Sequence, residues 1–137
     1  MRTIKFRGRL KSNGNWEHGD LLHDNVDGCY VYPVEAENLY KGNEVIPKTV
    51  GQFTGLYDKD GEEIYEGDIL QFGNSPSGVC EVKWNESIAA FCIRFHFENE
   101  IGSRPLGEWL VEKKNIAIIG NIHDNPELMK GNGKSKN

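Results

Sequence analysis

Residues 50–70, which read VGQFTGLYDKDGEEIYEGDIL, contain two extended segments joined by a turn. Its centre, residues 58–61, is Asp-Lys-Asp-Gly, a turn motif in which an aspartate bonds nearby backbone and a glycine adopts positive φ. Gly67 and Asp68 then begin a strand over residues 67–72. We expect the Asp68 carboxylate to accept backbone N–H bonds where this strand starts. The sequence therefore predicts structural roles for Asp58, Gly61, Gly67 and Asp68.

Short strand-like segments continue on both sides of this stretch. Between turn residues they occupy 4–8, 16–22, 29–34, 44–53, 79–84, 88–97, 108–112 and 115–122. Two segments differ from this pattern: 99–107 is predicted as a loop from its glycines and Pro105, and Asn125-Pro126-Glu127 predicts the start of a short helix. Short strands at this spacing are typical of small barrels and sandwiches.

These elements predict an all-β fold with two β-units. Residues 1–56 form an N-terminal hairpin and meander unit, and residues 57–130 form a small SH3-like barrel with a short C-terminal helix. Residues 131–137 (GNGKSKN) have no apolar side chain to bury, which predicts a disordered tail. Residues 16–22 and 64–70 share a Gly-Asp pair, either as an internal repeat or as two strand starts of one kind.

Three motifs in this chain resemble the YopX family of phage and prophage proteins. They are Ile4-Lys-Phe-Arg7, the stretch 50–70, and residues 118–128, which read IIGNIHDNPEL. The resemblance covers about residues 3–128, and it is weaker at Gly8-Arg9, where the family often has a small residue and an aromatic. It implies an all-β fold with SH3-type barrel character and residence in the cytoplasm of an infected or lysogenic bacterium. It implies no activity.

Composition limits the class of protein. Of the 137 residues, 37% are apolar and 27% are charged. The longest apolar run, residues 88–93, is far shorter than the ~20 residues that cross a bilayer, and the N-terminal residues lack the apolar segment of a signal peptide. Cys29, Cys80 and Cys92 are too few and too widely spaced for a disulfide framework or a zinc site. We expect a cytoplasmic protein with no membrane segment and no cofactor.

The net charge of −5 is unevenly distributed. Residues 13–112 carry six basic and nineteen acidic residues, a net charge of −13. Because nucleic acid needs cations at its phosphates, a host or phage protein is the preferred partner. The alternative is a single-stranded nucleic-acid-binding module, with Trp16 or Trp84 stacking on bases. Its cations would be the tail lysines and Arg2, Lys5, Arg7 and Arg9.

Two side-chain clusters are candidates for chemistry. His18, Asp20, His23 and Asp24 are the best metal candidates, but residues 18 and 23 point to opposite faces of one continuous strand, so no metal site is predicted. The acidic group around Glu66 and Asp68 has no histidine or nucleophile within its motif. We therefore expect no enzyme, and a small hydrolase using Glu66 and Asp68 is a third hypothesis behind the two binding functions.

The candidate binding surface is a polar stripe beside aromatic rings. Gln52 and Thr54 share one face of a strand, and Tyr65 and Trp84 are amphipathic rings that suit either a binding surface or the core. Together with Glu66 they form the candidate binding set. Open strand edges also predict a homo-oligomer, through pairing of residues 29–34 with a second copy.

Overall fold

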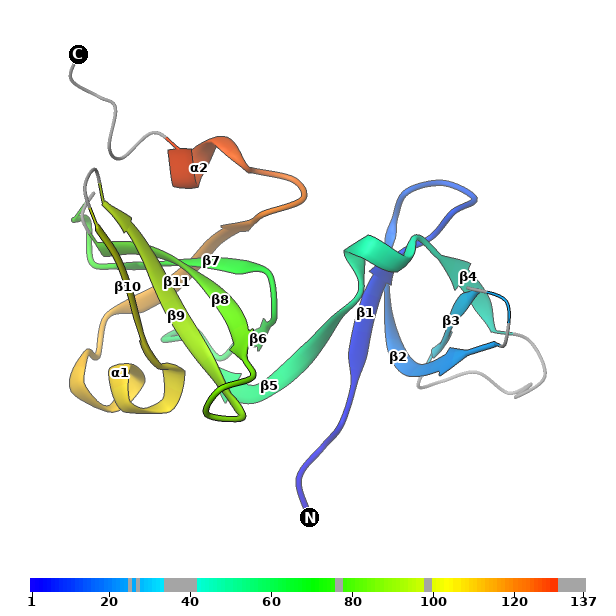
Figure 1. Ribbon diagram of the computed structural model, residues 1–137, viewed down its shortest axis with the longest axis horizontal. Coiled ribbons are helices and arrows are strands. Elements are labelled where there is room, and N and C mark those ends of the chain that lie inside the picture. The colour runs from blue at the N-terminus through cyan, green and yellow to red at the C-terminus, as the bar shows by residue number, and fades with distance from the viewer. Residues whose placement is uncertain (25, 27, 34–41, 76–77, 98–99, 131–137) are drawn as a thin grey trace. The chain divides into compact units, whose positions relative to one another are not determined.

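The computed structural model describes residues 1–24, 26, 28–33, 42–75, 78–97 and 100–130. In these ranges antiparallel strands dominate and the helices are short, so the fold is all-β, as predicted (Figure 1). The chain divides into two units, residues 1–55 and 56–137. The tail predicted at 131–137 lies outside the described residues.

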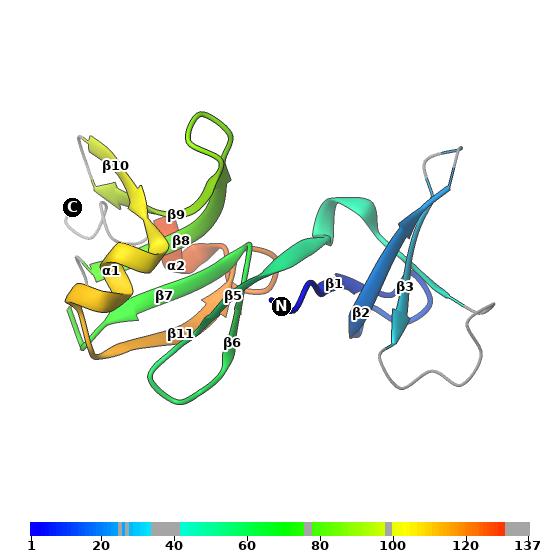
Figure 2. The same cartoon turned by 90° about the horizontal axis from the view of Figure 1, so that it is seen from below.

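The first sheet has the strand order β4-β3-β2-β1-β5-β6. Its strands are β1 (Phe6–Arg9), β2 (Trp16–His23), β3 (Cys29–Pro33), β4 (Asn43–Val45), β5 (Gly51–Tyr57) and β6 (Glu63–Tyr65). β2 and β3 lie side by side, with Leu21 opposite Val31 (Figure 2). Cys29, Val31 and Val45 form the buried core of the first unit. The short 3-10 helix η1 (Pro47–Thr49) interrupts residues 44–53, where Pro47 indicated a break.

β3 is an interior strand, which corrects one prediction. Over residues 29–31 it pairs with β2 on one side and with β4 on the other. Its backbone groups there are already used, so the predicted pairing of residues 29–34 with a second copy is wrong over residues 29–31. Pro33 is the last residue of the strand, a position that a proline tolerates.

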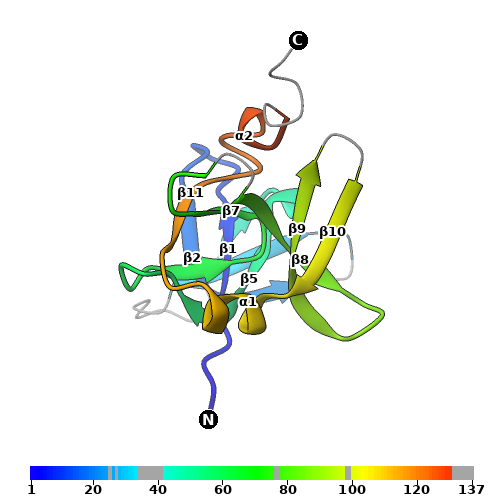
Figure 3. The same ribbon diagram turned by 90° about the vertical axis from the view of Figure 1, so that its left-hand side faces the viewer.

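The second sheet has the strand order β10-β9-β8-β7-β11. Its strands are β7 (Asp68–Phe72), β8 (Val79–Asn85), β9 (Ala90–Phe97), β10 (Glu100–Pro105) and β11 (Ile116–Asn121). The helix α1 (Leu106–Glu112) connects β10 to β11, and α2 (Glu127–Lys130) follows β11; they lie at opposite ends of this unit (Figures 1 and 3). Among the described residues β10 and β11 do not pair, so the five strands form an open sheet rather than a closed SH3-like barrel.

Alternation along β7 separates the two faces of this sheet. Ile69 packs with Val79 and with Met129 of α2 on one face. Leu70 belongs to the larger core on the other face, together with Leu106 and Trp109 of α1. The cross-strand register extends these faces over β8, β9 and β10. The α2 face then carries Glu81, Lys83, Cys92, Arg94 and Ser103, and the α1 face carries Val82, Trp84, Phe91 and Ile93.

Two predictions between residues 99 and 112 are wrong. The segment predicted as a loop contains β10, which pairs with β9 through Gly102 and ends at Pro105 on the outer edge of the sheet, where a proline is tolerated. The segment predicted as a strand at 108–112 is helical. Leu106, Trp109 and Leu110 stand at helical spacing and pack into one core.

Candidate functional site

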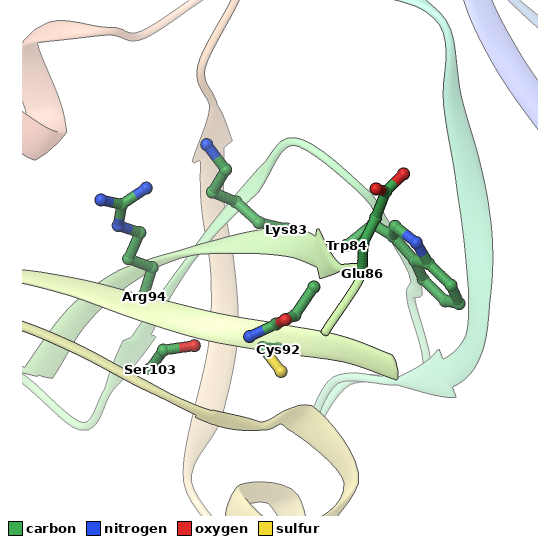
Figure 4. Close-up of a pocket in the computed structure, with 7 residues that line it drawn as sticks. Lys83, Trp84, Glu86, Cys92, Arg94 and Ser103 are labelled. Carbon is green, nitrogen blue, oxygen red and sulfur yellow. The ribbon is translucent and has the colours of Figure 1, made fainter. Parts of the chain in front are cut away.

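A pocket of about 500 Å³ lies over β8, β9 and β10 (Figure 4). This volume falls within the range of small-molecule sites, roughly 300–1,000 Å³. The lining side chains are polar, cationic, anionic and aromatic: Lys83, Trp84, Asn85, Glu86, Cys92, Arg94 and Ser103. No motif found in the sequence includes Lys83, Arg94 or Ser103.

The sheet register brings the two cations of this pocket together. Arg94 on β9 stands opposite Ser103 on β10, and Lys83 on β8 stands opposite Cys92, one diagonal step from Arg94. Lys83 is exposed and Arg94 is half-buried. Figure 4 shows both side chains extending to the same side of the strands, with Glu86 beside Trp84 and away from Arg94.

Neither pocket cation has an ion-pair partner within the described part of the chain. Glu81 stands directly opposite Arg94, yet no ion pair joins them. The neighbouring Arg104 behaves differently, since its guanidinium donates to Glu112 Oε2 at 3.0 Å. That hydrogen bond lowers the pKa of Glu112 and raises the pKa of Arg104. Arg104, on the α1 face, is therefore engaged by Glu112, whereas Arg94 has no such ion pair among the described residues.

The β8–β9 hairpin presents apolar side chains to solvent. The Trp84 ring is 42% exposed and meets the Phe91 ring edge to face, with the ring centroids 5.0 Å apart. Ile88, in the turn, is 53% exposed. Ala89 has a φ of 53°, in the left-handed region that costs a residue with a Cβ roughly 1–2 kcal/mol.

The five residues of the candidate binding set do not form one cluster. Gln52 and Thr54 are half-buried on β5 in the first unit, and the other three belong to the second unit. Tyr65 is only 2% exposed, and its hydroxyl donates to Glu63 Oε1 at 3.0 Å, so its ring is core with a bonded polar tip. Glu66 is half-buried. Of the five, Trp84 alone lines the pocket.

Asp58 organises the turn at 58–61 and ties it to β11. Its Oδ1 accepts the backbone N–H groups of Asp60 and Glu62, each at 2.9 Å. Its Oδ2 accepts the N–H of Ile118 at 3.1 Å. Gly61 has a φ of 82°, as this turn requires. The carboxylate thus joins a local turn to a strand sixty residues further along the chain.

Asp68 is buried, with 2% of its surface exposed, and its Oδ2 accepts the N–H of Tyr65 at 2.7 Å. Gly67 has a φ of 96°, donates to the carbonyl of Val82 and accepts from the N–H of Ile122. A carboxylate held in this way is poorly placed to act on a substrate. This arrangement does not favour the hydrolase hypothesis for Glu66 and Asp68.

Two basic side chains of the N-terminal segment pack against the aromatic ring of Trp16. The guanidinium groups of Arg7 and Arg9 lie 4.7 and 5.0 Å from the Trp16 ring centroid. Arg9 also donates to the carbonyl of Gly14 at 2.8 Å. These cation–π contacts use the ring within the protein, so Trp16 is less suited to stacking on a base. Lys5 lies similarly over Phe53, 5.6 Å from its centroid.

The histidine and aspartate residues considered for metal binding lie on or next to β2. Asp24 accepts the N–H groups of Val26 and Gly28 at 2.9 and 2.7 Å, and these bonds hold its pKa below the usual value. Across the described ranges, no three metal-ligating side chains are grouped as they would be around an ion. The three cysteines are buried free thiols, and burial raises the pKa of Cys80.

The described helices are too short or too polar to cross a membrane.

Comparison with known proteins places the chain in a family. No curated protein sequence matches it. The crystal structure of protein EF1440 from Enterococcus faecalis is similar, with 21% sequence identity over 94% of this chain and 99% of that chain, and a TM-score of 0.51. That likeness shows a shared fold. The family described as YopX protein matches residues 5–130, so the chain belongs to the YopX family.

Proposed function

We propose that this protein is a non-enzymatic accessory protein of phage type, which acts in the bacterial cytoplasm by binding a host or phage protein. Membership of the YopX family supports the phage connection. In this proposal the sheet β7–β11 is an SH3-like scaffold, and its β8–β9 hairpin makes the first contact with the partner.

The exposed apolar tip of the β8–β9 hairpin carries this proposal. Trp84 and Ile88 expose 42% and 53% of their surface. Tryptophan is among the residues most enriched at the energetic centres of protein interfaces. The left-handed backbone at Ala89 is a further local cost, and such costs cluster at functional segments. A large exposed ring on β8, close to the hairpin turn, therefore favours docking to another protein.

The motif residues support binding rather than catalysis. Asp58 and Asp68 accept backbone N–H groups, and Glu63 accepts the Tyr65 hydroxyl. Bonds of this kind stabilise the fold, which supports a structural role for these carboxylates.

Charge favours a protein partner over nucleic acid. Residues 56–137 carry nine basic and fourteen acidic side chains, a net charge of −5, whereas residues 1–55 carry seven of each. A polyanionic strand would meet net repulsion at the unit that presents Trp84. The nucleic-acid alternative would need Trp16, whose ring already lies near Arg7 and Arg9.

Affinity capture from a bacterial host lysate tests this function, at low and at moderate salt. We expect the wild-type chain to retain a specific protein that Trp84→Ala loses, since truncating an interface anchor costs about 2 kcal/mol or more, roughly thirtyfold in affinity. Tyr57→Ala is the matched control, because Tyr57 is 54% exposed in the same unit but lies on β5. Recovery of background proteins alone, or equal losses in both variants, would contradict the proposal.

A further inference from the structure

We propose that Lys83, Arg94 and Ser103 form a binding site for the phosphoryl group of a small phosphomonoester. The three ligand-binding residues belong to the α2 face of the sheet, whereas the Trp84 ring, which borders the same pocket, belongs to the α1 face.

The site is assembled by the register of three neighbouring strands. Ser103 and Arg94 are directly opposite, so their Cβ atoms are about 5 Å apart, and Lys83 is a diagonal neighbour of Arg94 at about 7–8 Å. A guanidinium fork, an ammonium group and a hydroxyl therefore line one opening of about 500 Å³, together with Trp84, Asn85, Glu86 and Cys92. This opening has room for one small molecule and not for a long strand.

The charges select an anion. Lys83 and Arg94 are diagonal neighbours, so an anion held between them is attracted by both cations. Within the described residues neither cation forms an ion pair, although Glu81 is opposite Arg94 and Glu86 lines the same pocket beside Trp84 and away from Arg94 (Figure 4). An anion bound between Lys83 and Arg94 would give both cations a partner of opposite charge.

The donor set favours a phosphoryl group over a carboxylate. A phosphomonoester carries nearly two negative charges and three acceptor oxygens near pH 7. Arginine binds two such oxygens with its planar fork, and lysine binds a third as a point charge. Ser103 is exposed and adds a hydroxyl that can bond the ester. A carboxylate has one charge and would leave one cation without a partner.

Amide spectra of the ¹⁵N-labelled full chain test the site, with inorganic phosphate, phosphoserine, a mononucleotide, a phosphoserine peptide and glutamate as separate probes in a low-salt buffer without phosphate. We expect saturable shifts confined to β8, β9 and β10 with the small phosphomonoesters. Inorganic phosphate binding as tightly as the esters would show that the phosphoryl group alone is recognised. Glutamate binding equally well, or binding by the peptide alone, would overturn the assignment.

Matched variants locate the binding. Arg94→Gln should weaken phosphoserine about tenfold or more, and Lys83→Gln about threefold to tenfold, since each removes a charge-assisted hydrogen bond. Arg104→Gln removes the same charge from the other face, where Glu112 already pairs with it, and should leave binding within about twofold.

Ile88→Ala truncates the exposed hairpin tip at a residue that does not line the pocket, and it should leave phosphoserine binding unchanged. Failure of the partner capture and failure of this site are therefore distinguishable. Equal losses of phosphoserine affinity in Arg94→Gln and Arg104→Gln would overturn the site.

The amide shifts of the wild-type chain test the site even where a variant folds poorly. The absence of shifts at β8–β10 up to about 10 mM phosphoserine would refute the proposal, because this concentration is well above that of specific small-ligand binding.

Discussion

Single carboxylates in the family motifs hold backbone amides. The Asp58 carboxylate accepts the N–H groups of the residues two and four positions later in the chain. The Asp68 carboxylate accepts the N–H group of the residue three positions earlier. Bonds this local follow from the sequence, because aspartate beside a turn glycine competes well for nearby N–H groups. The contact from Ile118 to Asp58 spans sixty residues, and no local pattern predicts it.

Asp68→Ala should destabilise the protein. The buried N–H of Tyr65 would lose a charge-assisted bond worth about 1.5–3 kcal/mol. About 1 kcal/mol shifts the melting temperature of a domain this size by roughly 3–5 °C, so we expect a fall of at least that amount. Asp68→Asn should cost less, because the amide oxygen still accepts. A thermal melt of Asp68→Ala that coincides with wild type would refute this structural role.

Gly19 is a position where any side chain collides with the neighbouring strand. A Cβ there would stand 1.9 Å from the carbonyl oxygen of Tyr32 on β3. Gly19→Ala must therefore push β2 and β3 apart, and we expect a loss of about 2 kcal/mol or more, as for an overpacked core. Denaturant unfolding measures it, with the exposed Asp20→Ala as control. Equal midpoints for the two variants would show that the strands separate without cost.

The pocket cations illustrate why the candidate site escaped prediction. Lys83, Arg94 and Ser103 are about ten residues apart in sequence and share no motif. They meet only because β8, β9 and β10 pair in one register. The segment that forms β10 was predicted as a loop, so Ser103 was not predicted to lie on the sheet. The aromatic candidates, by contrast, were visible by type, but type alone does not separate the buried Tyr65 from the exposed Trp84.

Elements were predictable where alternation was clear. The strands near residues 6, 16, 29, 68, 79, 90 and 116 all follow such a pattern or a turn signal. Between Gly102 and Glu112 local signals conflict, and tertiary packing decides. The spacing of Leu106, Trp109 and Leu110, with Glu108 in the first turn, was the helix signal; the flanking Pro105 and Gly107 obscured it.

Gly107→Ala tests the stability of the helix α1. Gly107 lies in α1, its φ is not in the left-handed region, and a Cβ there would meet no atom within 4 Å. Alanine favours a helix over glycine by up to about 1 kcal/mol. We expect the melting temperature to rise by a few degrees. Gly61→Ala, in a turn with φ of 82°, is the opposite control and should lower it. A fall in both variants would contradict a stable helix at 106–112.

Among the described strands β10 presents the longest open edge, and we expect the protein to associate through that edge. The interior position of β3 removes the pairing first expected there. β4 has only three residues, and part of the outer edge of β11 is taken by Asp58 and by the N–H of Lys59, which donates to Ile116. β10 has six residues, and in the described residues it pairs only with β9.

Light scattering of the protein at tens of micromolar should therefore give a particle mass well above the 15.5 kDa of one chain. An exposed edge of this length is a template for a second strand. Hydrogen exchange of the backbone amides in β10 should slow as the concentration rises, whereas amides of the short β4 should not change and serve as the control. A mass of one chain at every concentration would refute association. An oligomer whose β10 amides exchange at a constant rate would place the contact on another surface.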